Sequence, residues 1–282
     1  EDADTSGVAA VPIYGRYART LALGGARGVI MIEPGEGAYL RATLRFPNVQ
    51  VWPAVIARVR RVFDLAADPA VIAAHLSEDP DLAPMVAARP GLRAPGAWDG
   101  FELSVRAVLG QQIPVQAARV LAGRITASHG SALEDEAANK LGLTHFFPTP
   151  DQLSLIDVET LPMPRARGRA LVGLSKAAAA DPDLFGTRRS LDEAVAALRA
   201  LPGIGEWTAQ YIAMRALREP DAFPSADIGL MRALEGPDGV RPTPAELLAR
   251  AERWRPWRAY AASHLWSADP KNPSEAKHAK AA

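Results

Sequence analysis

The hydrophobic period of this chain changes once, from two residues to between three and four, and that change limits the folds it can adopt. Between residues 38 and 46 apolar side chains alternate with polar ones, as in a strand with one face in solvent. The apolar segments 19–23 and 28–32 are expected to be its partner strands. From residue 53 to 65 the apolar side chains have helical spacing. We therefore predict a small antiparallel sheet covered by a helix, an α+β domain that ends near residue 75.

The rest of the chain is predicted to be helical. Helical periods are separated by Pro and Gly, and no convincing strand alternation follows residue 75. Capping-box patterns at 149–152 and 190–193 mark two helix starts. Residues 268–282 contain little to bury and are predicted to be a frayed tail. The predicted fold class is thus α+β followed by all-α.

Composition removes several classes of function. The 32 basic and 32 acidic residues balance, so a charged partner must meet a local patch. The absence of cysteine excludes disulfides, thiolate-ligated zinc, iron–sulfur clusters and thiol nucleophiles, and the five histidines have no metal-ligand spacing. No apolar run could span a bilayer, and the acidic start is unlike a signal peptide. We expect a cytoplasmic protein and, because the first residue is not Met, a processed chain or a piece of a longer one.

The most informative segment lies between residues 191 and 218. An apolar helical stripe ends at the turn Leu-Pro-Gly-Ile-Gly (201–205), and a second stripe with Trp207 and Tyr211 follows almost at once. Two helices joined in this way form a helix–hairpin–helix. The two glycines let an anion approach the backbone closely, and the second helix offers it unpaired N–H groups. The pattern predicts that the hairpin binds one phosphate group. The alternative is an ordinary tight turn with two core aromatics.

Downstream of the hairpin, a loop containing Pro224 leads to an aspartate at a helix start. Asp227 is followed by Ile-Gly-Leu-Met-Arg, which has the apolar content of a new helix. The simplest interpretation is that Asp227 only caps that helix. Its carboxylate is also the strongest candidate in the chain for chemistry.

The ordered set of motifs resembles the helix–hairpin–helix DNA glycosylases, and within them the 3-methyladenine DNA glycosylase II (AlkA) type. The similar segments are Val-Arg-Ala-Val-Leu-Gly-Gln-Gln-Ile at 105–113, Phe-Pro-Thr-Pro at 147–150, Leu-Pro-Gly-Ile-Gly-Glu-Trp-Thr-Ala-Gln-Tyr at 201–211, Asp227 after its Phe-Pro loop, Arg-Trp-Arg-Pro-Trp-Arg at 253–258 and His-Leu-Trp at 264–266. The resemblance as a whole runs from about residue 14 to residue 267, nearly the whole chain.

The resemblance implies an α+β small antiparallel-sheet domain followed by all-α helix–hairpin–helix glycosylase domains. The predicted domains are an α+β domain at 1–75, a helical domain at 76–99 with 220–267 that carries the catalytic Asp, a helical domain at 100–219 with the hairpin, and a tail at 268–282.

A base pocket and a catalytic residue are also implied. Enzymes of this class extrude the target base from the stack and hold it in a snug pocket. The resemblance assigns Trp207, Tyr211 and Trp266 to the pocket, where aromatic faces would favour a cationic N-alkylated purine. It assigns catalysis to Asp227, whose charge would stabilise the oxocarbenium-like sugar or orient water. Bifunctional relatives carry Lys where this chain has Trp207, so a monofunctional enzyme is expected.

The same resemblance implies DNA contacts at the hairpin and at a second loop. The expected DNA-binding residues are Gly203, Ile204, Gly205 and Thr208 at the hairpin and Gln111 and Gln112 at the loop. No cofactor is expected, although Na⁺ or a similar cation could bind the backbone carbonyls of Arg199, Leu201 and Ile204.

Two positions depart from the family pattern. The residue that fills the gap left by the extruded base is Leu in familiar members, whereas Gln112 stands here. The position after the catalytic Asp is commonly aromatic and is Ile228 here, which predicts a more open pocket.

The predicted function is therefore base excision repair: hydrolysis of the N-glycosidic bond of N-alkylated bases, of the 3-methyladenine and 7-methylguanine type, to leave an abasic site. The expected partner is double-stranded DNA with a damaged base, and we expect a nucleoid-associated monomer with no membrane partner and with an upstream fused regulatory domain. Two alternatives stay open: a non-catalytic helix–hairpin–helix module that binds DNA or damage, and a glycosylase for deaminated or oxidised bases.

Overall fold

The computed structural model describes residues 10–13, 15–186 and 189–269. The chain forms two compact units, residues 1–57 with 104–184, and residues 58–103 with 185–282. It passes between these units within two helices, α1 (Trp52–Val62) and α4 (Gly100–Leu109), and again after residue 184. The finer domain boundaries expected from the sequence remain a prediction.

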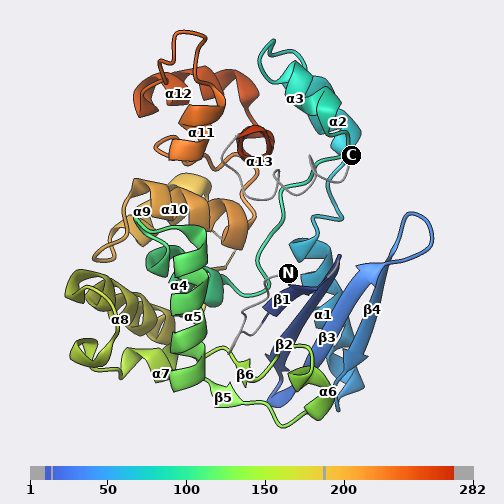
Figure 1. The fold of residues 1–282 in the computed structure, drawn as a ribbon, viewed down its shortest axis with the longest axis vertical. Coiled ribbons are helices and arrows are strands. Elements are labelled where there is room, and N and C mark those ends of the chain that lie inside the picture. Colours follow the sequence, from blue (N-terminus) through green and yellow to red (C-terminus); the bar gives the residue numbers. More distant parts are fainter. Residues whose placement is uncertain (1–9, 14, 187–188, 270–282) are drawn as a thin grey trace. The chain divides into compact units, whose positions relative to one another are not determined.

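The first unit contains a four-stranded antiparallel sheet with strands in chain order (Figure 1). Its strands are β1 (Ala10–Ile13), β2 (Arg16–Leu23), β3 (Ala26–Pro34) and β4 (Leu40–Arg45). The three predicted strands are present, and β1 is an addition that sequence analysis missed. This segment has only four residues, without apolar alternation, and its Pro12 suits an edge strand because proline cannot donate to a ladder.

A second, two-stranded sheet corrects the prediction that everything after residue 75 is helical. Strands β5 (Ser131–Ala132) and β6 (His145–Phe146) pair after the helix α5 (Val115–His129). Each has two residues, too few for an alternating pattern. The segment around them packs on the large sheet, where Ala138 and Leu143 join Ala18 and Val29 in one buried cluster. Their pairing is a result of this packing.

Other elements of the first unit are short, apart from one helix. They are η1 (Val49–Val51), α6 (Glu136–Asn139), α7 (Pro150–Ser154), η2 (Val158–Thr160) and the long helix α8 (Arg165–Ala180). The predicted capping box at the start of α7 is confirmed: Thr149 and Gln152 each bond the other's backbone N–H.

Helices make up the described part of the second unit. They are α2 (Pro69–Leu76), α3 (Ala83–Ala88), α9 (Leu191–Arg199), α10 (Glu206–Ile212), the π-helical turn η3 (Ala213–Leu217), α11 (Ile228–Ala233), α12 (Pro244–Ala251), η4 (Glu252–Trp254) and α13 (Arg258–Ala268). The predicted capping box of Ser190 and Glu193 at α9 is confirmed, and Thr243 with Glu246 forms another at α12. The predicted fold class, a small antiparallel sheet followed by helical structure, is confirmed.

The start of the predicted tail needs one correction. Asp269 is buried and pairs with Arg232 through two hydrogen bonds, of 2.8 Å from Nε and 2.5 Å from the terminal nitrogen. The chain therefore remains packed one residue beyond α13. The rest of that predicted tail, residues 270–282, lies outside the described residues.

Candidate active site

The hairpin between α9 and α10 combines a buried anchor with an exposed backbone. The Ile204 side chain is buried, and its N–H donates to the carbonyl of Leu201 at 3.1 Å to close the turn. Gly203 has φ of +81°, a conformation that costs other residues free energy, and it is exposed. Gly205 is also exposed and is the N-cap of α10. Thr208, expected as a hydroxyl donor to DNA, is buried in α10.

Three aromatic side chains predicted for the base pocket lie together. Trp207 and Tyr211 stack with ring centroids 5.3 Å apart and planes at 7°. Trp266, from α13, meets Tyr211 edge to face at 6.3 Å and 68°. Because Trp207 and Tyr211 stack directly on each other, a base cannot lie between their rings. The outer surface of this aromatic group is what remains for stacking with a planar ligand.

The loop that carries Asp227 is tied to α10 by a side chain that sequence analysis missed. The Gln210 side-chain oxygen accepts the backbone N–H of Phe223 at 3.0 Å, and the Phe223 ring is buried. Further along the loop, the N–H of Asp227 donates to the Pro224 carbonyl at 2.9 Å. A hydrogen bond therefore connects the second hairpin helix, α10, to the aspartate loop, and no local sequence pattern indicates this connection.

The Asp227 carboxylate is the point where these elements converge. Its Oδ1 accepts the N–H groups of Gly229 at 2.8 Å and Leu230 at 3.1 Å, which confirms the predicted helix cap. The same oxygen accepts the indole N–H of Trp266 at 2.9 Å. Its Oδ2 accepts the indole N–H of Trp207 at 2.8 Å. Oδ1 has three donors and Oδ2 has one, so Oδ2 retains the greater capacity to face a positive charge.

A glycine at the first turn of α11 makes room for this arrangement. A Cβ on Gly229 would lie 3.0 Å from Asp227 Oδ1, 3.2 Å from Asp269 Oδ2 and 3.3 Å from Cδ1 of Trp266. These contacts are tighter than normal van der Waals packing.

Asp269 in turn raises the pKa of Arg232 by hydrogen bonding, and Asp227 adds to this effect through its charge. A cation therefore lies close to the carboxylate group.

The second predicted DNA contact lies in the other unit, in the loop between α4 and α5. Gln112 is exposed and has φ of +58°, a left-handed conformation that costs a residue with a side chain about 1–3 kcal/mol. The carbonyl of the preceding Gln111 accepts a hydrogen bond of 2.5 Å from Arg167 on α8. Strained backbone conformations cluster at functional sites. The positive φ of Gln112 is therefore an argument for its predicted role that the sequence did not provide.

The chemistry of the hairpin carbonyls fits a hard cation. Arg199 is the last residue of α9, where helix carbonyls lack intrahelical partners and the helix dipole is negative. The Leu201 carbonyl accepts one hydrogen bond, from Ile204, and carbonyl oxygens have two lone pairs. These oxygens and the Ile204 carbonyl would therefore hold Na⁺ through neutral ligands. Among the described residues there is no cluster of three His, Asp or Glu side chains able to hold a metal ion.

A buried histidine near Trp266 predicts a pH-dependent stability. Burial lowers the pKa of His264, whose Nδ1 has no hydrogen-bond partner. The folded protein thus binds this proton less well than the unfolded chain, in which the pKa is about 6.5. As the pH falls below that value, His264 should reduce the free energy of unfolding. Urea unfolding of the wild type and His264→Gln from pH 8 to pH 5 measures this, and the wild type should lose stability faster. Parallel curves would contradict the prediction.

In the described part of the chain, no helix is both long and apolar enough to cross a membrane.

This chain is similar to known DNA repair proteins named AlkA or DNA-3-methyladenine glycosylase. A family model described as the AlkA N-terminal domain matches residues 5–99. The chain is 40% identical over 253 residues to a probable bifunctional transcriptional activator/DNA repair enzyme AlkA of Mycobacterium tuberculosis, an alignment that covers 90% of this chain and 50% of the relative. The chain therefore spans about half the length of that relative.

Two further alignments each cover most of this chain and most of the similar protein. Among solved structures, the 3-methyladenine DNA-glycosylase from Archaeoglobus fulgidus superposes with a TM-score of 0.81 at 23% identity, covering 94% of this chain and 90% of that one. This similarity shows the shared fold. With DNA-3-methyladenine glycosylase 2 of Escherichia coli, the chain shares 35% identity over 264 residues, which are 92% of this chain and 88% of the relative. The chain belongs to the DNA-3-methyladenine glycosylase 2 (AlkA) family.

Proposed function

We propose that this chain is a monofunctional DNA glycosylase that hydrolyses the N-glycosidic bond of N-alkylated purines in double-stranded DNA and leaves an abasic site. One observation carries the proposal: the Asp227 carboxylate is held by the indole N–H groups of Trp207 and Trp266, the same side chains that form the aromatic group. The two indoles thus have two roles: they hold the carboxylate that would face the sugar, and they form part of the aromatic surface that would bind the base. Family membership supports the alkylated purine as substrate.

In the proposed mechanism the base leaves the DNA stack first. Extrusion costs a few kcal/mol and is cheapest for a damaged base with weakened pairing. The base then rests on the outer face of the aromatic group formed by Trp207, Tyr211 and Trp266. A purine alkylated at N3 or N7 is cationic, and cation–π attraction of about 0.5–2 kcal/mol favours it over a neutral base. Ile228, which is 59% exposed, leaves this side of the site open to bulkier lesions.

Bond cleavage then needs little help at the leaving group. The C1′–N bond breaks with both electrons leaving on the base, and a cationic base departs neutral. Positive charge develops on the sugar, where Asp227 Oδ2 stabilises it, and water adds to C1′ with loss of a proton. Position 207 holds Trp, which cannot form the Schiff base that a lysine amine forms during strand cleavage. The reaction therefore stops at the abasic site, and it requires no cofactor.

The proposed DNA contacts come from two places. At the hairpin, the exposed backbone at Gly203 and Gly205 grips a phosphate, with Ile204 as the buried anchor. At the α4–α5 loop, exposed Gln112 occupies the gap left by the extruded base, with Gln111 beside it. An upstream regulatory domain and a monomeric state remain predictions.

The test is release of free base from methylated duplex DNA by the wild-type protein, with strand breaks assayed before and after alkali. We expect release of 3-methyladenine and 7-methylguanine, with breaks only after alkali treatment. Breaks before alkali would contradict monofunctionality. Binding without release of a methylated base would favour the non-catalytic module or, if hypoxanthine is released instead, a different lesion range.

Trp266→Phe tests whether an indole N–H positions Asp227. The substitution keeps an aromatic ring but removes one donor to a carboxylate, an interaction worth about 1.5–3 kcal/mol. Base release should fall roughly 10- to 100-fold at saturating DNA.

Trp254→Phe is the control, because the Trp254 indole donates to Asp79 at 2.8 Å, a buried carboxylate outside the candidate site, and Phe keeps an aromatic ring against Phe223. It should lower stability without lowering release per folded molecule. Equal effects of the two variants on release would contradict the positioning role of Trp266.

A further inference from the structure

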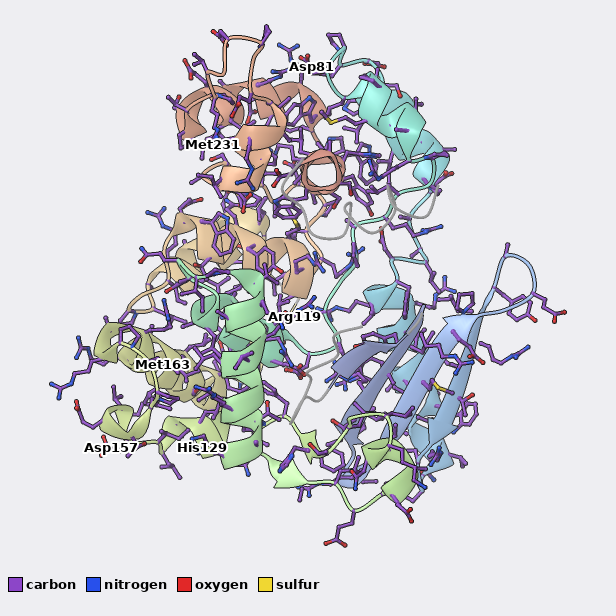
Figure 2. All side chains as sticks on the ribbon, in the orientation of Figure 1. Asp81, Arg119, His129, Asp157, Met163 and Met231 are labelled. Atoms are coloured by element: carbon purple, nitrogen blue, oxygen red, sulfur yellow. The ribbon has the colours of Figure 1, made fainter. Side chains whose placement is uncertain are left out.

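The α4–α5 loop has an unusual support. The loop closes as a tight turn, in which the N–H of Ile113 donates to the Gly110 carbonyl at 3.5 Å, and Gln112 within it has φ of +58°. The Arg167 guanidinium reaches the loop from α8 and donates to the Gln111 carbonyl at 2.5 Å. The loop and α8 belong to the same unit, for which Figure 2 labels Arg119 on α5 and Met163 just before α8.

This hydrogen bond controls one peptide plane. The Gln111 carbonyl and the Gln112 N–H belong to the same rigid unit, so rotation of that unit changes ψ of Gln111 and φ of Gln112 together. A positive φ is disfavoured for glutamine, and relaxation to a negative φ would rotate the carbonyl away from Arg167. A bond from a charged guanidinium is stronger than a bond between neutral groups. Arg167 therefore favours the left-handed conformation at Gln112.

We propose that Arg167 is a positioning residue that holds Gln112 in the conformation in which it fills the gap left by the extruded base. The proposal rests on the proposed function for the role of Gln112. Arg167 acts through the backbone of the loop and needs no contact with DNA. Its half-buried position fits this role, whereas Arg169, on the same helix, is exposed.

Arg169 supplies a matched control. Arg169→Met and Arg167→Met remove the same guanidinium charge and keep an unbranched stem at two positions of one helix, but of these two arginines only Arg167 bonds the loop. A general loss of attraction between α8 and DNA should affect both variants alike. Loss of the turn should affect Arg167→Met alone.

The first experiment uses the DNA-free protein. Amide hydrogen exchange of the segment 110–114 should be faster in Arg167→Met than in the wild type and in Arg169→Met, because the turn opens more often. Unchanged exchange in Arg167→Met would overturn the proposal. If this variant does not fold, Arg167→Lys, with a single-point donor in place of the fork, should show the same change at smaller size.

The second experiment compares base release from duplex and single-stranded methylated DNA. Gln112 has a gap to fill only in a duplex, so Arg167→Met should lower duplex release roughly 10-fold or more and leave single-stranded release near that of wild type. Equal loss on both substrates, or an unchanged ratio, would overturn the positioning role. If the wild type releases no base, the proposed function fails, and the exchange result alone decides whether Arg167 holds the turn.

Discussion

Replacing Asp227 with Asn should lower the rate of alkylpurine release by at least roughly 100- to 1,000-fold, or about 3–4 kcal/mol of transition-state stabilisation, while duplex binding persists. Asn keeps the size of the side chain but removes the charge that faces the developing cation on the sugar. It also turns one oxygen into a donor. One of the two indole N–H groups that Asp227 now accepts, from Trp207 or Trp266, would then face another donor.

The measurement is single-turnover release of base from methylated duplex DNA, with binding followed separately. Single-turnover conditions isolate bond cleavage from product release. Retention of release within threefold of wild type would remove Asp227 from the mechanism. Loss of binding together with release would show a structural role instead.

Asp79 offers a control outside the candidate site, because it has a similar set of neutral hydrogen-bond donors in addition to ion pairs with Arg250 and Arg253. It accepts the N–H groups of Asp81 and Leu82 on one oxygen and the Trp254 indole on the other. Asp79→Asn should therefore cost stability, and release per folded molecule should stay at the wild-type level. The pair of variants separates an aspartate that only holds a turn from a catalytic one.

Arg218→Met is the substitution expected to cost the most stability, about 3–5 kcal/mol. Arg218 donates to the Asp64 carboxylate and to the Ala94 carbonyl. Asp64 is buried and also accepts the Tyr260 hydroxyl at 2.8 Å. Burial raises the pKa of Tyr260 to about 12, so this hydroxyl keeps its proton. Removal of the guanidinium would leave the Asp64 charge buried with neutral donors only.

Urea unfolding of the wild type and Arg218→Met measures this cost. Arg255 is the control, because its side chain is 47% exposed in its ion pair with Asp221, compared with 20% for Arg218. Arg255→Met should cost at most about 1 kcal/mol. Adding Asp64→Asn to Arg218→Met should recover part of the loss, since the two residues interact directly. A loss below about 1 kcal/mol for Arg218→Met would contradict the role of this network.

Local patterns were sufficient for much of the fold. The three longest strands, the capping boxes at Thr149 and Ser190 and the hairpin turn all depend on contacts within a few residues, and each was predicted. The failures were short segments. β1 and the β5–β6 pair have too few residues for a period, and their strand geometry comes from pairing and from packing on the large sheet. Asp269 looked like part of the tail because its partner, Arg232, is distant in the sequence.

The candidate site divides in the same way. The candidate site residues at positions 207, 211, 227 and 266 could be identified from the sequence, because each lies in or next to a motif and the motifs occur in the family's order. Their hydrogen bonds could not: both indoles on one carboxylate, Gln210 on the aspartate loop and the tight space at Gly229 join segments far apart in the chain. In the sequence, Arg167 is one of several basic residues between 165 and 176, and nothing there indicates its bond to Gln111.

The sequence by itself determined the α+β class with its helical continuation, the helix starts, the hairpin and the identity of the candidate catalytic aspartate, because these depend on local periodicity, capping and ordered motifs. Only the tertiary structure decided which oxygen of Asp227 remains available, which face of the aromatic group can receive a base and how Gln112 is held at a positive φ. These features depend on the directions of hydrogen bonds and on close packing between distant segments, and neither leaves a periodic signal in the chain.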